Sequence, residues 1–600
     1  MSDVKCVGRQ KYEGQRLSGR HRSTHGSQAR EVGPIDACRL RPEGRSDTSV
    51  PTKAARETHT INGGKPAISG FKVVLGLCIF LLAPTLSSQS SFAEQNPTAR
   101  TNILWISIDD QAPWYGTYGD TRVQTPNIDA LASQGVVFER AYAPSPVCSP
   151  TRSAIITGTY SIRTGTHDHR SGRVPSYQIR LPEGVTTVPE IFRKAGYTTY
   201  NGAKDDFNFA YDRSDLYSIA EGFSFERNQY NQASRTFPEQ SITNDNDKAA
   251  VPKRRRAKGT TALERGDQSW KGSAGGGDWR DVTGGSVFFG QMSVAGGKGV
   301  KNLESQLPSL GYTPVKPADV RVPAQYPDIP QVRRHLADHY NSVLRTDYQV
   351  GQTVSRLKAD GLWKNTVIFL YSDHGSDLPR SKEFTYAEGL HVPLIVVAPG
   401  MSEVVKPGSR RSDLVNLIDI AATSLALSTL SVPDYMDSKN LFAKNYSRDY
   451  VFSSADRMSN VIDRVRSVMG ERYHYIRNFM IDRPLMNWGH REMISLADPE
   501  ESSFLMIRRL AAQGKLTFAQ AAPYGPRAPE ELYDLQNDPD EVVNLAQDPA
   551  HAAQLDAMRF QLEDWIVDTD DKGQYPRSEA AWTEITERFP ASWLRSPEFQ

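Results

Sequence analysis

Two uninterrupted apolar runs, far apart in the chain, both lead into acidic side chains. The first, ILWISI, ends at Asp109 and Asp110, and the second, TVIFLY, stops just before Asp373 and His374. Continuous apolar runs of this length are typical of strands that are buried on both faces of a parallel sheet. Because ligands bind at the carboxyl ends of strands in α/β sheets, we expect these four side chains to meet at one sheet edge.

Helical periodicity fills the chain between these strands. Thr125 is the expected N-cap of one helix, and residues 186–207 read as a helix followed by a strand. A long amphipathic helix is predicted to end at Gly361, directly before the second apolar run. Helical spacing also resumes after Cys148, so we expect this residue at or just before a helix N-terminus.

The pattern changes beyond about residue 440. Short alternating runs such as VRSVMGERYHYIRNF predict antiparallel strands, and AAQLDAMRFQLEDWIVDT predicts an amphipathic terminal helix. We therefore interpret residues 94–438 as a catalytic domain and residues 439–600 as a small α+β subdomain. Residues 250–285 are basic, rich in glycine and aperiodic, which predicts a long surface insertion in the first domain.

Composition places the basic charge at the N-terminus. The 600 residues are 38% apolar and 24% charged with a net charge of +1, which is typical of a globular protein and does not indicate nucleic-acid binding. Residues 1–93 carry 14 Lys and Arg against 7 Asp and Glu. Lys72, a short apolar run and a final Ser-Phe-Ala predict a signal peptide at 71–93, with an uncleaved anchor or a buried strand as alternatives. Residues 1–70 are expected to be disordered or to precede the natural start.

Cys148 is the only cysteine outside the N-terminal segment. In an exported protein such a thiol is a reactive group, an intermolecular partner or a small buried apolar side chain. Together with Arg152 at the start of a helix, and with Lys204 and Lys382, it predicts a nucleophile beside an anion site. The three aspartates suit Ca²⁺ or Mg²⁺, whereas the nitrogen of His374 also admits Mn²⁺ or Zn²⁺.

The segment CSPTRSAIITG resembles the Cys-x-Pro-x-Arg signature of the type I sulfatases. ILWISIDDQ, TVIFLYSDHG, KEFTYAEGLHVPLIVVAPG and ELYDLQNDPDEVVNLAQDP match other family segments in order, so the resemblance covers nearly all of residues 100–570. Within the family, the chain most resembles the sulfamidase-like and bacterial polysaccharide sulfatases. It implies an alkaline-phosphatase-like α/β fold, in which helices enclose a large mixed sheet and a smaller C-terminal domain holds an antiparallel sheet.

The resemblance also implies a mechanism. A maturase would oxidise Cys148 to formylglycine, and the hydrate of this aldehyde would attack a sulfate ester or N-sulfate of a sulfated polysaccharide or oligosaccharide. Arg152 would hold the hydrate, while Lys204 and Lys382 would contact the sulfate. The implied metal is Ca²⁺, with Mg²⁺ or Mn²⁺ as alternatives. Its ligands would be Asp109, Asp110, Asp373 and His374, together with the modified Cys148.

Three positions depart from the family pattern. His374 stands where many relatives have Asn, although Asp-His also occurs in the family. Asp206 and Lys298 stand where relatives have catalytic histidines. The residue that protonates the leaving group is therefore open, with Lys298, Asp206 and His167 as candidates and His169 nearby in GTHDHR. Substrate selection is expected from residues 205–300 and from a C-terminal group of side chains, namely Asn487, Trp488, His490 and Arg491.

Two other functions share these features. A phosphodiesterase or phosphonate hydrolase on the same fold would use the same metal and nucleophile. A catalytically inactive, glycan-binding homologue would be expected to lose parts of the catalytic set. The signal peptide predicts export to the periplasm or the medium, with no stable membrane insertion after cleavage.

Overall fold

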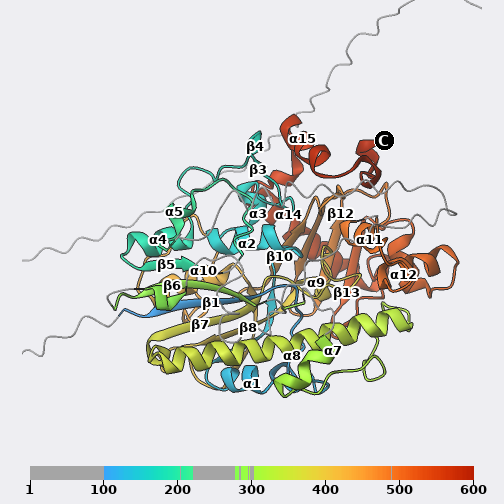
Figure 1. Cartoon of the computed structure of the whole chain (residues 1–600). Helices are drawn as coiled ribbons and strands as arrows, with labels where there is room; N and C mark the ends of the chain where they lie inside the picture. Colours follow the sequence, from blue (N-terminus) through green and yellow to red (C-terminus); the bar gives the residue numbers. More distant parts are fainter. Residues whose placement is uncertain are drawn as a thin grey trace, which may run out of the picture. The chain divides into compact units, whose positions relative to one another are not determined.

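The computed structural model describes residues 100–202, 204–219, 278–282, 285–294, 296–297, 303–487 and 489–600. Among these residues, a seven-stranded mixed sheet has the order β5-β6-β1-β7-β8-β2-β9 (Figure 1). Their bounds are β1 Asn102–Ile108, β2 Val136–Tyr142, β5 Thr198–Asn201, β6 Phe288–Val294, β7 Thr366–Ser372, β8 His391–Val397 and β9 Ser409–Asn416. β1 pairs in parallel with β6 on one side and β7 on the other, whereas β8 is antiparallel to both β7 and β2.

Helices cover both faces of this sheet (Figure 1). Alternate residues of β1 point to opposite faces, so Trp105 packs with one apolar core and Leu104 with the other. The principal helices on the two faces are α2 Cys148–Thr157, α4 Val188–Lys194 and α10 Asp419–Leu427, opposite α1 Pro126–Ala132 and α8 Pro330–Ala359. The expected N-cap Thr125 is confirmed, and α8 ends at Ala359, just before the left-handed Gly361 that was predicted as its end.

The C-terminal region contains a second, antiparallel sheet of four described strands in the order β10-β11-β12-β13. These strands are β10 Val451–Ala455, β11 Val465–Met469, β12 Tyr473–Asn478 and β13 Glu530–Asp534. The two-sheet α/β architecture expected from the sequence is therefore confirmed. α14 Ala552–Asp568 is the helix predicted as terminal, but that prediction is wrong. Ser578 caps a further helix, α15 Glu579–Arg588, by accepting a hydrogen bond from Ala581 N–H.

Shorter elements connect these layers. The remaining α-helices and the β-hairpin are α3 Ser161–Thr164, β3 Arg173–Val174, β4 Tyr177–Gln178, α5 Arg213–Leu216, α7 Leu303–Gln306, α9 Ala387–Leu390, α11 His490–Ser495, α12 Ser503–Ala512 and α13 Phe518–Ala521. The 3-10 helices are η1 Gly116–Tyr118, η3 Trp279–Asp281, η4 Leu307–Leu310, η5 Trp363–Asn365, η6 Ala522–Tyr524, η7 Pro549–His551, η8 Lys572–Gln574, η9 Ala591–Trp593 and η10 Pro597–Phe599. Among the described helices, none has the length and apolar character needed to cross a bilayer.

The second sheet supports the segment that leads into α2. Ser453 Oγ donates to the Ala143 carbonyl at 2.7 Å, and Ser454 N–H donates to the Pro144 carbonyl at 3.0 Å. Val147, which precedes Cys148, is fully buried in a small apolar cluster with side chains of β10, β11, β12 and β13. The start of α2 is therefore held by both sheets.

Several predicted regions lie outside the described residues. They are the extension at 1–70, the signal peptide at 71–93 and most of the insertion at 250–285. The predicted domain boundary at 438/439 falls between β9 and β10, and the division into two domains stays a prediction.

A buried ion-pair group in the second sheet gives the first testable prediction. Arg466 of β11 is fully buried and binds Asp571 at 2.7 Å and Asp456 at 3.0 Å. Arg466→Ala removes the ion pair of buried Asp456 and leaves Asp571 paired with Arg464 alone, so we expect the free energy of unfolding to fall by about 3–5 kcal/mol in urea denaturation. Arg477→Ala removes a partly exposed pair with Glu563 and should cost less than about 1 kcal/mol. Equal losses in the two variants would contradict this account of the sheet.

Candidate active site

The parallel pairing of β1 with β7 places two acidic strand ends side by side. Ile108 is in register with Ser372, so the residues that follow each strand are neighbours. Asp110 N–H donates to Asp373 Oδ1 at 3.1 Å, and Gln111 N–H donates to the His374 carbonyl at 3.2 Å. The two strand ends therefore meet, as the sequence predicts.

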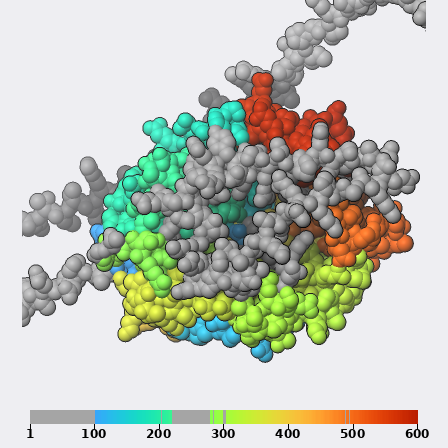
Figure 2. Space-filling view, viewed as in Figure 1, coloured from blue at the N-terminus to red at the C-terminus, as the bar shows by residue number. Residues whose placement is uncertain are grey.

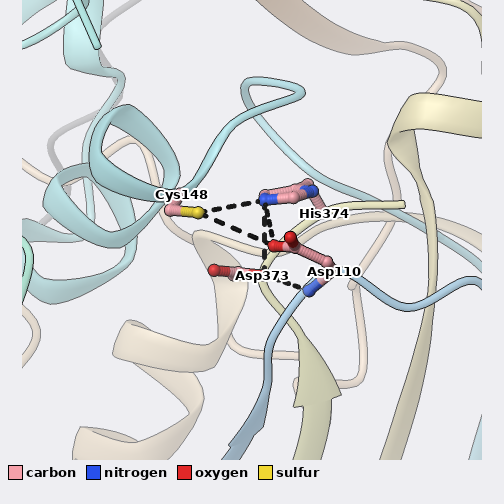
Figure 3. A group of neighbouring side chains, drawn as sticks. All are labelled: Asp110, Cys148, Asp373 and His374. Atoms are coloured by element: carbon pink, nitrogen blue, oxygen red, sulfur yellow. Dashed lines mark hydrogen bonds and ion pairs between the residues drawn. The ribbon is translucent and has the colours of Figure 1, made fainter. Parts of the chain in front are cut away.

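Cys148 is the first residue of α2 and is 1% exposed. Its Sγ lies 3.2 Å from His374 Nε2 and 3.7 Å from Asp110 Oδ1 (Figure 3). Lys382 Nζ is 3.5 Å from the same sulfur. The expected position at a helix N-terminus is thus confirmed. The side chain points into a group of charged residues, which is not the surrounding of a cysteine that serves only as a small apolar filler.

A set of possible metal ligands surrounds the sulfur. One ligand atom from each of Asp110, Cys148, Asp373 and His374 lies within 4.8 Å of all the others, and all four residues are buried (Figure 3). His374 Nδ1–H donates to the Gly375 carbonyl at 3.0 Å, which leaves Nε2 to face Asp110 at 3.0 Å. Two carboxylates and one imidazole nitrogen are donors that suit a divalent cation.

The electrostatics of this group also favour positive charge. Burial by itself would lower the pKa of His374, but the charge of Asp373, with smaller contributions from Cys148 and Asp110, raises it to about 9. The carboxylates thus stabilise a cation in their midst. A divalent metal ion therefore fits both the donor types and the charge of the site.

Asp109, which was predicted as a further ligand, is not one of the four residues of this group, and its metal role stays a prediction. Its carboxylate binds Arg152 and lies 3.7 Å from Lys204 Nζ. The two adjacent aspartates therefore have different partners, since Asp110 faces His374 and Lys382 instead. Arg152 Nε also donates to Asp373 Oδ2 at 3.0 Å, and its guanidinium therefore joins the two strand ends.

The two lysines lie against different carboxylates. Lys382 Nζ is 2.7 Å from Asp110 Oδ2, and Lys204 Nζ is 2.8 Å from Asp206 Oδ2. Arg173 binds the other oxygen of Asp206 at 2.7 Å. Burial would raise the pKa of Asp206, but the neighbouring cations hold it well below its usual value. Asp206 is therefore ionised at neutral pH and acts there as a counterion.

Four non-glycine residues around the site have left-handed backbone conformations. The φ angles are 56° for Asp110, 56° for Arg170, 55° for Asp206 and 79° for Glu383. Such residues are uncommon, and the strain they carry often marks functional sites. Glu383 directly follows Lys382, and burial raises the pKa of its carboxyl group. Neither Arg170 nor Glu383 was predicted as a site residue. The position of Arg170 directly after the candidate histidines of GTHDHR could have indicated it, whereas no sequence pattern indicates Glu383.

The remaining predicted residues are placed less centrally. His169 Nδ1 is 2.9 Å from Ser459 Oγ, and burial, reinforced by nearby cations, lowers the pKa of His169 well below its usual value. His167 Nδ1 is buried and makes no hydrogen bond in the part of the chain that the structure describes. Lys298, Trp488 and the side chain of His490 lie outside the described residues.

Two of the residues expected to select substrate lie near Lys382. Asn487 and Arg491 line a cavity that Lys382 and Glu383 also line. Arg491 is held there by Asp377, whose Oδ2 lies 2.8 Å from its guanidinium. The cavity therefore connects the C-terminal segment with the group around Cys148.

Comparison with known proteins gives consistent matches. Residues 101–269 and 306–430 match the model of the family named Sulfatase. The chain is 30% identical to an ulvan-active sulfatase of Formosa agariphila over 499 residues, 80% of this chain and 77% of that one. It is 24% identical to human N-sulphoglucosamine sulphohydrolase over 495 residues, 78% of this chain and 90% of that one. The crystal structure of the phosphonate monoester hydrolase of Agrobacterium radiobacter has a similar fold, with a TM-score of 0.52 and 18% identity over 80% of this chain and 99% of that one.

The ligand group predicts that a divalent cation stabilises the folded protein. Titration with Ca²⁺ should raise the thermal midpoint, and free Ca²⁺ at roughly a hundred times Kd corresponds to about 2.7 kcal/mol. Asp373→Asn should abolish most of this shift, because it removes one of the two carboxylates in the group. Asp434→Asn changes an exposed aspartate and should keep the shift. An equal Ca²⁺ response in the two variants would contradict the assignment.

Proposed function

Because the chain belongs to the sulfatase family and is a sulfuric ester hydrolase, we propose that it removes sulfate from a sulfated carbohydrate through a formylglycine made from Cys148. The observation that carries this proposal is the position of Cys148. It starts a helix within the Cys-x-Pro-x-Arg sequence, and its sulfur lies among the metal-ligand candidates and beside Lys382. Conversion of this side chain to an aldehyde hydrate would place a hydroxyl nucleophile at the position of the sulfur.

Asp110, Asp373 and His374 would hold the divalent cation, for which we propose Ca²⁺ with Mg²⁺ or Mn²⁺ as alternatives. When bound, the cation supplies positive charge that stabilises the sulfate oxygens and the hydrate. Asp109 was predicted as a further ligand. Its contacts with Arg152 and Lys204 support a different role, in which it orients two cations that face the substrate.

The chain's own side chains suggest the course of the reaction. A hydroxyl of the hydrate attacks sulfur while Asp373, which lies close to the position of the nucleophile, accepts its proton. The bond between sulfur and the leaving oxygen or nitrogen breaks, and Lys204 and Lys382 neutralise the charge on the sulfate. The second hydroxyl then loses its proton, the aldehyde C=O forms again, and the C–O bond to sulfate breaks.

The leaving group must also receive a proton. Asp206 is disfavoured as this donor at neutral pH, because the cations around it hold its pKa well below its usual value. Lys298 and His167 stay candidates. Lys382 is a further candidate, since its ammonium group lies 3.5 Å from the Cys148 sulfur.

The nature of the substrate rests on the relatives. One is named an ulvan-active sulfatase and the other an N-sulphoglucosamine sulphohydrolase, which supports a sulfated saccharide as the substrate of this chain. Export to the periplasm or the medium is proposed from the N-terminal signal sequence. A maturase is the second partner that this function requires.

A phosphonate or phosphodiester hydrolase is the second candidate, favoured by the fold shared with the Agrobacterium enzyme. Comparison of turnover on 4-nitrophenyl sulfate and on bis(4-nitrophenyl) phosphate separates the two. We expect a higher kcat/KM on the sulfate. A clear preference for the diester would favour the second candidate. An inactive glycan-binding homologue is disfavoured, because Cys148, Arg152 and the ligand group are all present and in contact.

The role of Cys148 can be tested by mass and by activity. Protein made together with a maturase should carry the aldehyde in the peptide that contains Cys148 and should release sulfate from 4-nitrophenyl sulfate. Cys148→Ala should lower this activity by several orders of magnitude while thermal unfolding stays cooperative. Protein of unchanged sequence made without a maturase is the matched control, and it should be inactive. An active preparation that carries only the thiol would exclude the mechanism.

Lys382 provides a second test. Lys382→Ala removes a cation beside the nucleophile, so we expect kcat/KM for sulfate release to fall by about 10²–10³-fold. Lys406→Ala removes an exposed lysine and should leave the rate unchanged. Similar rates for the two variants would show that Lys382 does not act on the sulfate.

A further inference from the structure

A group of arginines lies next to the Lys204 side of the site. Asp206, the counterion of Lys204, also binds Arg173 at 2.7 Å and has Arg170 at 3.9 Å. Arg170 N–H donates to the hydroxyl of Ser149 at 2.8 Å, and Ser149 directly follows the nucleophile position. The arginines therefore adjoin both the start of α2 and the lysine expected to contact sulfate.

The C-terminal helix adds a further arginine to this group. α15 packs against β4, and it ends at Arg588, whose Nη1–H donates to the Arg170 carbonyl at 2.6 Å. The surfaces of these two parts of the chain, cyan and red, lie side by side in Figure 2 as their ribbons do in Figure 1. The group thus joins segments from opposite ends of the described chain.

The carboxylates near these arginines already bind other groups. Asp206 binds Lys204 and Arg173 at short distances. Glu584 accepts the backbone N–H groups of Gly172 and Arg173, each at 3.2 Å. A third carboxylate, Asp168, forms a bidentate pair with Arg577, with both distances at 2.9 Å.

Arg170 and Arg588 are consequently left with little compensating charge. The carboxylate oxygen paired with Arg170 lies at 3.9 Å, and its buried Nε has no hydrogen-bond partner. Within the described part of the chain, Arg588 makes no ion pair. Burial and the charges of the neighbouring arginines outweigh the opposing charge of Glu584 and hold the pKa of Arg588 well below its usual value. Positive charge that is partly buried in this way is stabilised by a bound anion.

The backbone around Arg170 is also fixed in advance. Its N–H is bound by Ser149, its carbonyl is bound by Arg588, and its φ of 56° is a strained conformation for an arginine. A guanidinium on such a fixed backbone loses less freedom when it binds a ligand. The planar fork of each guanidinium matches the two oxygens of a carboxylate or a sulfate.

We propose that Arg170 and Arg588 form a subsite for a second anionic group of the substrate, a sugar carboxylate or a second sulfate, next to the sulfate that is removed at Cys148. This inference rests on the proposed function and narrows it to glycans that carry two neighbouring anionic groups. The subsite would orient the sugar, while the chemistry stays with the groups around Cys148.

The experiment compares two substrates in each variant. One is 4-nitrophenyl sulfate, which has a single anionic group, and the other is a sulfated oligosaccharide that contains a uronic acid. In Arg588→Ala, the ratio of kcat/KM on the oligosaccharide to that on the aryl sulfate should fall about 10–100-fold, mainly through KM, because a charged hydrogen bond is lost. Arg588→Lys keeps the charge and should recover part of the ratio. Arg180→Ala, an exposed arginine nearby in sequence, should leave the ratio unchanged.

Two further measurements identify the anion and separate the failure of the subsite from that of the proposed function. Reduction of the uronic acid to an alcohol should remove the effect of Arg588→Ala if the subsite binds a carboxylate, whereas an effect that persists on a doubly sulfated oligosaccharide identifies a sulfate.

Binding of the oligosaccharide to Cys148→Ala protein, measured by calorimetry, should weaken when Arg170→Ala or Arg588→Ala is added. Loss of sulfatase activity with this binding difference intact would overturn the proposed function alone. Equal effects on both substrates, or no effect on binding, would overturn the subsite.

Discussion

The concentration of buried carboxylates at the edge where β1 meets β7 is the constraint on which the site depends. Parallel pairing puts Asp110 beside Asp373, and both are buried. Carboxylates removed from water in this way are stable only when cations surround them. Arg152 and Lys382 supply two of these cations, and the remaining negative charge raises the pKa of His374 to about 9 despite its burial. The same charge that fits a divalent metal ion thus also positions the side chains around Cys148.

Beyond this sheet edge, carboxylates and cationic side chains alternate. Asp109 faces Arg152 and Lys204, and beyond Lys204 lies Asp206 with its own arginine partners. Each carboxylate fixes the cation next to it, so the cations that would bind sulfate are oriented before any ligand arrives. The alternation stops at Arg170 and Arg588, where cations exceed the available carboxylates. Because of this excess of positive charge, an anionic sugar chain would extend from the strand ends toward Arg170 and Arg588.

The second sheet contributes to the site through packing. It buries Val147 and binds the backbone at Ala143 and Pro144, and thereby fixes the start of α2 and the direction of the Cys148 side chain. α15 acts in a similar way on the loop around Arg170. The C-terminal region therefore takes part in forming the site, although the residues expected to do the chemistry come from the first sheet and its loops.

The sequence by itself determined the central strands, the helix that starts at Cys148 and the residues nearest this cysteine, because these depend on local patterns: continuous apolar runs, helical spacing and a short motif. It did not determine that Asp109 and Asp110 diverge to different partners, since the direction of each side chain depends on the strand twist and on what packs against it. Nor did it reveal the contact of Arg588 with Arg170, which are 418 positions apart. Such a contact exists only when α15 has packed against β4, and no local pattern encodes that packing. The residues expected to do the chemistry could therefore be predicted from the sequence, whereas the surroundings that would select a substrate depend on the tertiary structure.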